Sequence, residues 1–146
     1  MGNGANPSVS AAIDVLICDD NQPLLALLRE VIGLRPSLRV VGEARDGNEA
    51  IVEARRFQPD IILLDLAMPR RTGLDALPEL RQVAPAAKII VFSGFSTASV
   101  VDEVLALGAA RYLSKGADID EINDAIEEVA AQAMSDPVVT GSVARE

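Results

Sequence analysis

The sequence predicts an α/β protein, because short apolar runs rich in β-branched residues alternate with longer segments of helical periodicity. The clearest run is Ile61–Leu64, which is continuously apolar, as a strand buried on both faces of a sheet requires. A helical segment separates each run from the next, so the strands are expected to be parallel and joined by right-handed crossovers. At 146 residues, the chain fits one domain.

Five strand–helix units are expected, with no internal repeat. The strands are predicted at Ile13–Cys18, Leu38–Ala44, Asp60–Asp65, Lys88–Phe92 and Arg111–Leu113. The helices are predicted at 23–34, 46–57, 72–83, 97–107 and 118–133. The second and fifth helices begin with patterns typical of a capping box, Asp46 with Glu49 and Asp118 with Glu121. Pro78 conflicts with the third helix, which must either begin late or kink there.

Composition excludes several classes of function. The chain carries 13 basic and 22 acidic residues, a net charge of −9, which opposes direct binding to nucleic acid backbones. It contains no histidine, so histidine metal ligands, Ser-His-Asp catalysis and phosphohistidine chemistry are excluded. The single cysteine, Cys18, cannot form an internal disulfide, which is consistent with a reducing cytoplasm. No apolar run is long enough to span a membrane.

Residues suited to holding a phosphoryl group follow four of the predicted strands. Asp19 and Asp20 follow the first strand, Asp65 ends the third, Ser93 follows the fourth, and Lys115 lies just beyond the fifth. The carboxyl ends of parallel strands share one edge of a sheet, where α/β proteins form their sites. Carboxylate oxygens suit Mg²⁺, an aspartate can attack phosphorus, and a lysine can hold phosphoryl oxygens. This pattern predicts a magnesium-assisted aspartyl-phosphate site, and therefore a switch.

Each of these features alone has an ordinary structural explanation. An Asp pair after a strand often serves only a turn or a helix cap, and a lone serine or lysine carries no signal. Four coincident strand ends are much harder to obtain by chance. We therefore prefer the functional interpretation of the set.

Four motifs at these positions carry a family resemblance over residues 14–133. They are VLICDDNQP, IILLDLAMPRRTGLDAL, IIVFSGF and GAARYLSKGAD. The chain resembles the receiver domain of two-component response regulators, whose acceptor, switch hydroxyl, switch aromatic and lysine are spaced as Asp65, Ser93, Tyr112 and Lys115 are here. The segments IILLDLAMP and VVGEARDG, with the serine at the switch, are most similar to the NarL/FixJ subfamily.

The resemblance implies a flavodoxin-like fold with strand order 2-1-3-4-5 and a phosphoryl group accepted by Asp65 from a sensor histidine kinase. It also implies a Mg²⁺ site made by Asp19, Asp20, Asp65 and the backbone carbonyl of Ala67. Lys115 would then hold the phosphoryl group.

The switch is also implied by the resemblance. Ser93 would move to bond the phosphoryl group, and Tyr112 would turn inward as the site fills. The surface of the fourth helix, fifth strand and fifth helix would then change. Such a domain is not an enzyme in the ordinary sense, because it catalyses only its own phosphoryl transfer and dephosphorylation.

The chain departs from the family pattern at several positions. Gly116 follows Lys115 where many receivers have proline, so a freer loop and a less tightly placed lysine are expected. Arg70 and Arg71 stand where the family commonly has glycine, and could assist a phosphodonor, meet a partner or simply be solvated. Ala67 and Phe95 flank the expected path of attacking water and cannot orient it, which predicts slow autodephosphorylation.

The expected organisation is a disordered lead-in at 1–12, a receiver domain at 13–134 and a linker or tail at 135–146. Expected partners are a sensor histidine kinase, a second copy on phosphorylation, and DNA only through an effector domain absent from these residues. The apolar first helix, 24–34, could serve a dimer contact or be buried on two sides. A cytoplasmic location and no membrane contact are expected.

The output of such a receiver and two other classes of protein stay open as alternatives. As a receiver, the chain could belong to a transcription factor or be a single-domain regulator that acts by protein contacts. A haloacid-dehalogenase-type phosphohydrolase needs a second aspartate at the position of Ala67. A flavodoxin-like flavin site needs a phosphate loop rich in Ser, Thr and Gly, where this chain has Asp19 and Asp20.

Overall fold

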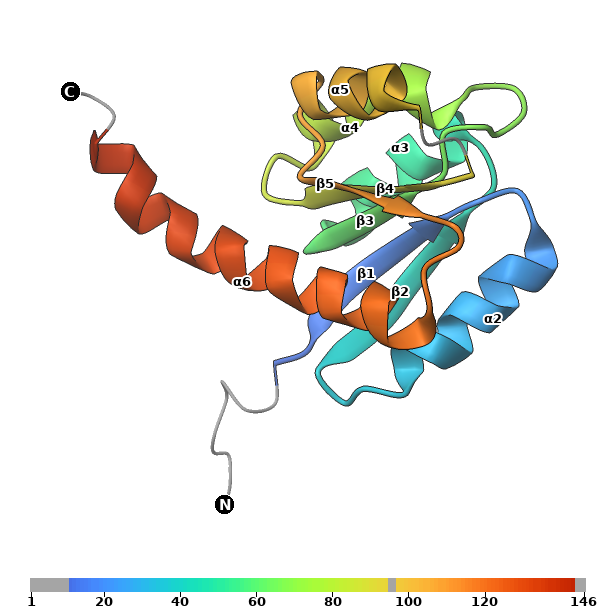
Figure 1. Ribbon diagram of the computed structural model, residues 1–146, viewed down its shortest axis with the longest axis horizontal. Helices are drawn as coiled ribbons and strands as arrows, with labels where there is room; N and C mark the ends of the chain where they lie inside the picture. The colour runs from blue at the N-terminus through green and yellow to red at the C-terminus, as the bar shows by residue number, and fades with distance from the viewer. Residues whose placement is uncertain (1–10, 95–96, 144–146) are drawn as a thin grey trace.

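The chain folds into a five-stranded parallel sheet with strand order β2-β1-β3-β4-β5, as the computed structural model in Figure 1 shows. The structure describes residues 11–94 and 97–143. The strands are β1 (Ile13–Cys18), β2 (Leu38–Ala44), β3 (Ile61–Leu64), β4 (Lys88–Ser93) and β5 (Arg111–Ser114). The predicted flavodoxin-like fold class and strand order are therefore confirmed.

The strand register aligns the carboxyl ends of β1, β3 and β4. Cys18 pairs with Leu64 across β1 and β3, and Leu64 pairs with Val91 across β3 and β4. One residue further along, the Asp65 amide donates to the Cys18 carbonyl at 3.0 Å. The residues that follow these strands consequently emerge at one edge of the sheet.

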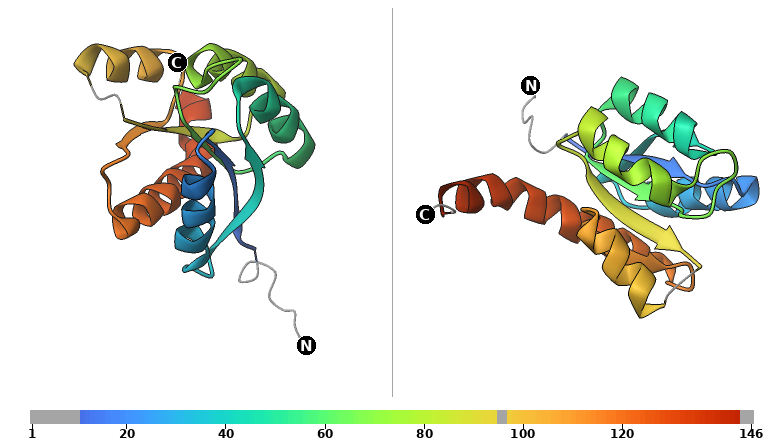
Figure 2. Two further views of the ribbon diagram at one scale, coloured as in Figure 1. Left: turned by 90° about the vertical axis from the view of Figure 1, so that its right-hand side faces the viewer. Right: turned by 90° about the horizontal axis from the view of Figure 1, so that it is seen from above.

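Helices cover both faces of the sheet (Figures 1 and 2). One face carries α2 (Gln22–Gly33) and α6 (Ile119–Val143); the other carries α3 (Gly47–Phe57), α4 (Gly73–Val83) and α5 (Ala98–Ala106). Each layer encloses its own cluster of buried apolar side chains. The central strands are buried on both faces, which explains why β3 is continuously apolar.

Side-chain caps begin the helices where the sequence predicts them. Asp46 Oδ1 accepts the amide of Glu49 at 2.8 Å, and Thr72 Oγ1 accepts the amide of Asp75 at 3.0 Å. The α6 capping box is reciprocal, because Asp118 accepts the Glu121 amide and Glu121 accepts the Asp118 amide. Such caps satisfy amides that have no partner inside the helix.

One predicted helix is found at its expected position despite a proline, and another is longer than expected. The α4 helix begins at Gly73, directly after its cap, and contains Pro78 on its exposed side; it does not begin late. The α6 helix, predicted to end near Ala133, continues to Val143, so Pro137 lies within helical backbone (Figure 1). Proline and glycine disfavour a helix interior, so the sequence pattern placed the end of this helix too early. The division into domain and tail stays a prediction.

The apolar surfaces of α2 and α6 are only partly buried. In α2, Leu25, Leu28 and Ile32 are buried but Leu27 is 54% exposed, so burial on two sides was the wrong alternative. In α6 an apolar stripe recurs at spacings of three and four, formed by Ile119, Ile122, Ile126, Val129 and Ala133. Ile119 is 47% exposed because it lies in the first turn, ahead of the buried part of the stripe. Ala133, the last member of that stripe, lies beyond the residues whose side chains are described.

The acidic face of α6 is held by arginines of the same chain. Arg35, in the α2–β2 connection, pairs with Asp124 at 2.8 Å and with Glu127 at 2.9 Å. Arg111 of β5 pairs with Glu128 at 2.7 Å. These acids therefore tie α6 to the domain. Within the described ranges, no helix has the length and apolar character needed to cross a membrane.

Candidate functional site

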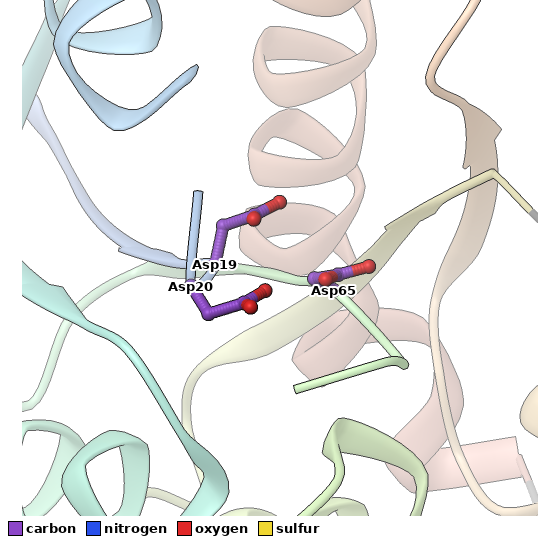
Figure 3. Close-up of side chains that lie close together, drawn as sticks. All are labelled: Asp19, Asp20 and Asp65. Atoms are coloured by element: carbon purple, nitrogen blue, oxygen red, sulfur yellow. The ribbon is translucent and has the colours of Figure 1, made fainter. Parts of the chain in front are cut away.

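Three carboxylates gather at the carboxyl edge of the sheet (Figure 3). Asp19 and Asp20 follow β1, Asp65 follows β3, and one oxygen from each lies within 4.8 Å of the others. Asp19 is only 2% exposed and Asp65 is also buried, whereas Asp20 is exposed. The structure thus brings together the acidic residues that the sequence predicted to share this edge.

Lys115 reaches the same cluster from the β5–α6 connection. Its Nζ lies 2.8 Å from Asp19 Oδ2 and 3.3 Å from Asp65 Oδ1. Burial alone would lower the pKa of Lys115, but its hydrogen bond to Asp19 and the charge of Asp65 outweigh burial and raise it. The lysine is therefore charged and offsets part of the repulsion among the carboxylates.

Asp65 has an environment that disfavours its ionised form. Burial raises the pKa of Asp65, and the neighbouring charge of Asp19 raises it further. Lys115 and the backbone amide of Ala67 oppose this shift without cancelling it. A buried carboxylate in this setting is stabilised by any added cation.

The donor set suits a hard divalent cation. Asp19 Oδ1 accepts the Asn21 amide at 2.9 Å. Asp19 Oδ2 is buried, and Lys115 is its one partner among the described residues. An oxygen buried with an incomplete set of partners is available to bind a metal ion. Because Mg²⁺ prefers oxygen ligands from one or two carboxylates, water and phosphate, Asp19, Asp20 and Asp65 fit this ion.

Ser93 and Tyr112 lie beside one another on the two strands at one side of the sheet. Ser93 ends β4 and is fully buried. Tyr112, on β5, is half-buried, packs against the core under α3 and α4, and donates a long 3.4 Å hydrogen bond from its hydroxyl to the Ser93 carbonyl. The tyrosine hydroxyl is thus linked to the backbone of Ser93.

The β5–α6 connection is more ordered than Gly116 suggested. The amide of Lys115 donates to the Ser93 carbonyl at 3.0 Å, and the amide of Gly116 donates to Ser114 Oγ at 3.0 Å. The sequence interpretation missed Ser114, although serine hydroxyls commonly bond a backbone amide two residues on. Lys115 is consequently well placed despite the following glycine. Phe95 lies outside the described residues.

The arginines beside the pocket are both engaged. Arg70 Nε lies 2.6 Å from Asp46 Oδ2, and Arg71 pairs with Asp75 at 2.8 Å and with Glu79 at 3.0 Å. From the sequence, Asp46 is expected only as a helix cap. Its contact with Arg70 cannot be predicted, because the two residues lie 24 positions apart and no local pattern links them. Neither arginine is a free surface cation.

Comparison with known proteins places this geometry in a family. Residues 15–127 match the response regulator receiver domain. The chain belongs to the response regulator receiver family. The predicted resemblance is thereby confirmed, and the domain is a signalling module of two-component systems for which the family implies acceptance of a phosphoryl group.

Individual relatives support the assignment to the receiver family. This receiver is 36% identical over 120 residues to the nitrate/nitrite response regulator NarL of Escherichia coli, covering 82% of this chain and 56% of that protein. It is 33% identical over 115 residues to the chemotaxis protein CheY of Thermotoga maritima, covering 79% of this chain and 95% of that protein. The receiver spans about half the length of the curated transcription regulators that it matches.

Solved structures show the same fold. A LuxR-family response regulator from Aurantimonas sp. SI85-9A1 superimposes with a TM-score of 0.79 at 31% identity, covering 84% of this chain and 87% of that one. The receiver domain of a putative NarL from Mycobacterium tuberculosis gives a TM-score of 0.79 at 28% identity, covering 83% and 98%. The likeness to NarL- and LuxR-type regulators therefore holds in both sequence and structure.

Proposed function

We propose that Asp65 is the phosphoacceptor of this receiver and that Asp19, Asp20, Asp65 and the Ala67 carbonyl hold Mg²⁺ beside it. The observation that carries this proposal is the position of Lys115, 3.3 Å from Asp65 and 2.8 Å from Asp19. A cation that bridges both carboxylates is placed to contact phosphoryl oxygens once one of them is modified. Bound Mg²⁺ supplies the charge that offsets the incoming phosphate.

The proposed step is an in-line displacement. An Asp65 carboxylate oxygen bonds to phosphorus as the bond to the donor breaks, and the electron pair leaves with the donor's nitrogen or oxygen. The donor is a phosphohistidine of a sensor kinase, or acetyl phosphate in its place. Asp65 must be ionised to attack, and the charge of Lys115 lowers the pKa of the acceptor toward that state. The product is an acyl phosphate on Asp65.

The switch proposal uses the contact between Ser93 and Tyr112. The Ser93 hydroxyl is drawn toward the phosphoryl oxygens, and the space it leaves admits the Tyr112 ring. The Tyr112 hydroxyl then loses its 3.4 Å bond to the Ser93 carbonyl, which is weak because it is long. The surface of α5, β5 and α6 changes as a result.

The experiment is treatment of wild type and Asp65→Asn with acetyl phosphate in Mg²⁺ buffer. Wild type is expected to gain the mass of one phosphoryl group, and the variant none. Beryllofluoride with Mg²⁺ should change Tyr112 fluorescence in wild type only. Labelling of Asp65→Asn to the wild-type level would disprove the acceptor assignment.

We further infer that this receiver controls a transcription effector, because the regulators that it matches are transcription regulators such as NarL. A stand-alone regulator is the second candidate, favoured by the 95% coverage of CheY. The two differ in oligomeric state: light scattering should show a beryllofluoride-dependent dimer for an effector-controlling receiver and a monomer for a stand-alone one. A cytoplasmic site of action fits the single buried cysteine, Cys18.

This function includes no turnover of a separate substrate. A haloacid-dehalogenase-like phosphohydrolase would need an acid at position 67, where alanine is exposed beside the acceptor. The chemistry is therefore limited to phosphorylation and dephosphorylation of Asp65 itself. Failure to hydrolyse p-nitrophenyl phosphate while Asp65 is labelled by acetyl phosphate would support this limit, and steady turnover would contradict it.

A further inference from the structure

The β3–α4 loop, residues 65–73, contains a strained arginine that is held from outside the loop. Arg70 has a φ of 63°, in the left-handed region that residues with a Cβ rarely adopt. The Arg71 amide donates to the Pro69 carbonyl at 2.6 Å, which closes a γ-turn around Arg70. Strain of this kind persists only where the surroundings impose it.

The restraint comes from the start of α3. Asp46 is buried, and its two oxygens have separate partners: Oδ1 caps α3, and Oδ2 accepts from Arg70 Nε at 2.6 Å. The next residue, Gly47, donates its amide to the Arg71 carbonyl at 2.7 Å. A Cβ at Gly47 would lie 2.7 Å from that carbonyl oxygen, so the two backbones are in direct contact. Side-chain and backbone bonds thus fasten the same turn.

The far side of the loop is equally tight. The Gly73 amide donates to the Leu66 carbonyl at 3.0 Å, and a Cβ at Gly73 would lie 2.0 Å from the Asp65 carbonyl oxygen. Ala67 therefore sits on a short arc whose two ends, at Asp65 and at Arg70, are both immobilised. The alanine side chain cannot orient the Ala67 carbonyl, so the direction of this carbonyl depends on how the two ends of the loop are held.

We propose that the Asp46–Arg70 ion pair is a clamp that poses the Ala67 carbonyl toward the carboxylate cluster, which makes Arg70 a positioning residue for Mg²⁺ binding. This inference rests on the proposed function, in which Ala67 is a metal ligand. Outer partners of metal ligands commonly contribute roughly 10-fold or more to metal affinity. Arg70 acts through the loop and does not touch the metal.

The direction in which Mg²⁺ affinity changes when Arg70 is replaced distinguishes the clamp from a purely electrostatic effect. Removing a positive charge near the site would, by Coulomb's law alone, strengthen binding of a divalent cation. If Arg70 acts as a clamp, its loss should instead weaken Mg²⁺ binding. Arg71 is the matched control, because it carries the same charge in the same loop but its side chain pairs with Asp75 and Glu79 of α4.

The first measurement is the Kd for Mg²⁺ alone by titration calorimetry. Arg70→Ala and Arg70→Gly should weaken Mg²⁺ binding roughly 10-fold, and Arg70→Lys should restore part of the loss. Arg71→Ala should leave the Kd within about 2-fold, since the Arg71 charge is paired with Asp75 and Glu79 and is not bonded to Asp46. Arg70→Gly also removes the strain, so weak Mg²⁺ binding by a stably folded glycine variant would separate positioning from stability.

Asp46→Asn tests the other partner, because the asparagine amide oxygen still caps α3 while the charge facing Arg70 is lost. Combined with Arg70→Ala, it should add no further loss of Mg²⁺ affinity, since both changes break one interaction. Full additivity of the two losses would show that Asp46 and Arg70 act separately and would overturn the clamp.

The second measurement needs no metal. Amide hydrogen exchange at Gly47 in Mg²⁺-free protein should accelerate roughly 10-fold in Arg70→Ala and stay unchanged in Arg71→Ala, whose backbone carbonyl is intact. If wild type binds Mg²⁺ and Arg70→Ala binds it equally or more tightly, the clamp is wrong and the proposed function stands. If wild type does not bind Mg²⁺, the proposed function fails, and unchanged Gly47 exchange would refute the clamp separately.

Discussion

The ammonium of Lys115 lies 2.8 Å from the buried Oδ2 of Asp19. This pair joins the residue after β1 to the connection after β5, across the carboxyl edge of the sheet. It supplies the main compensation for a carboxylate that is otherwise removed from water. Lys115 consequently stabilises the resting domain as well as serving the proposed phosphoryl site.

Replacement of this lysine should destabilise the domain. Lys115→Met keeps most of the apolar stem but leaves Asp19 and Asp65 without a counter-charge. The cost should be about 1–3 kcal/mol in the free energy of unfolding, below the roughly 3–5 kcal/mol of a fully buried pair, because the Lys115 side chain is 29% exposed. Urea unfolding without divalent cations measures this cost, and Mg²⁺ should reduce it. Arg39→Met is the control, because Arg39 pairs with Asp14 on the exposed surface and should cost under about 1 kcal/mol. Equal losses would contradict the role of Lys115.

Asp65→Asn should stabilise the metal-free domain in a pH-dependent way. Because burial and Asp19 raise the pKa of Asp65 in the folded state, that state binds more protons than the unfolded one between the two pKa values. Wild-type stability from this group therefore falls as pH rises through that window. The gain from asparagine should be full at neutral pH and vanish as pH falls below the ordinary aspartate value of 3.8. A gain that is the same at every pH in urea unfolding would refute this.

Gly73 should tolerate no side chain. A Cβ there would lie 2.0 Å from the Asp65 carbonyl oxygen, so Gly73→Ala must displace the loop that follows Asp65, at about 2–4 kcal/mol in the free energy of unfolding. Gly33 is the control, because it lies in α2 and an added Cβ there would meet nothing within 4 Å. Gly33→Ala should gain about 0.5–1 kcal/mol. Thermal unfolding compares the two variants directly, and a neutral Gly73→Ala would count against the tight loop.

Ser93→Ala should uncouple Tyr112 from the phosphoryl site. Tyr112 is the only tyrosine and the chain has no tryptophan, so its fluorescence reports one position. Beryllofluoride with Mg²⁺ should change the emission of wild type, and the change should be largely lost in Ser93→Ala because no hydroxyl is drawn away. Tyr112→Phe, which loses only a 3.4 Å hydrogen bond, should alter stability by no more than about 1 kcal/mol. An undiminished signal in Ser93→Ala would argue against the coupled switch.

Ala67 should keep dephosphorylation slow. Its exposed methyl group cannot hydrogen-bond a water molecule beside Asp65. Ala67→Asn introduces an amide that can orient water, and should raise the rate of acyl phosphate hydrolysis roughly 10-fold or more. Mass spectrometry can monitor the decay of both phosphorylated proteins in Mg²⁺ buffer. If Ala67→Asn loses its phosphoryl group no faster than wild type, Ala67 is not the reason for slow dephosphorylation.

The strand ends show how far sequence reasoning reaches. Each predicted strand is found within a residue or so of its expected bounds, because alternation of apolar runs and capped helices is a local property. The predicted end of α6 is too early, since the helix continues through Pro137, a residue that normally ends a helical pattern. Ile119 shares the helical spacing of the buried Ile122 and Ile126 but is exposed, because periodicity marks a helix face and does not say where the sheet beneath it ends.

Sequence alone determined the fold class, the strand order through family resemblance, and the candidate residues Asp19, Asp20, Asp65, Ser93 and Lys115. Those depend on residue type, spacing and strand ends, which are local. Only the tertiary structure decided that Lys115 neutralises Asp19, that Ser114 orders the loop after β5, and that Asp46 holds a strained Arg70. These contacts join residues far apart in the chain, and their energies depend on burial and distance, which no local pattern contains.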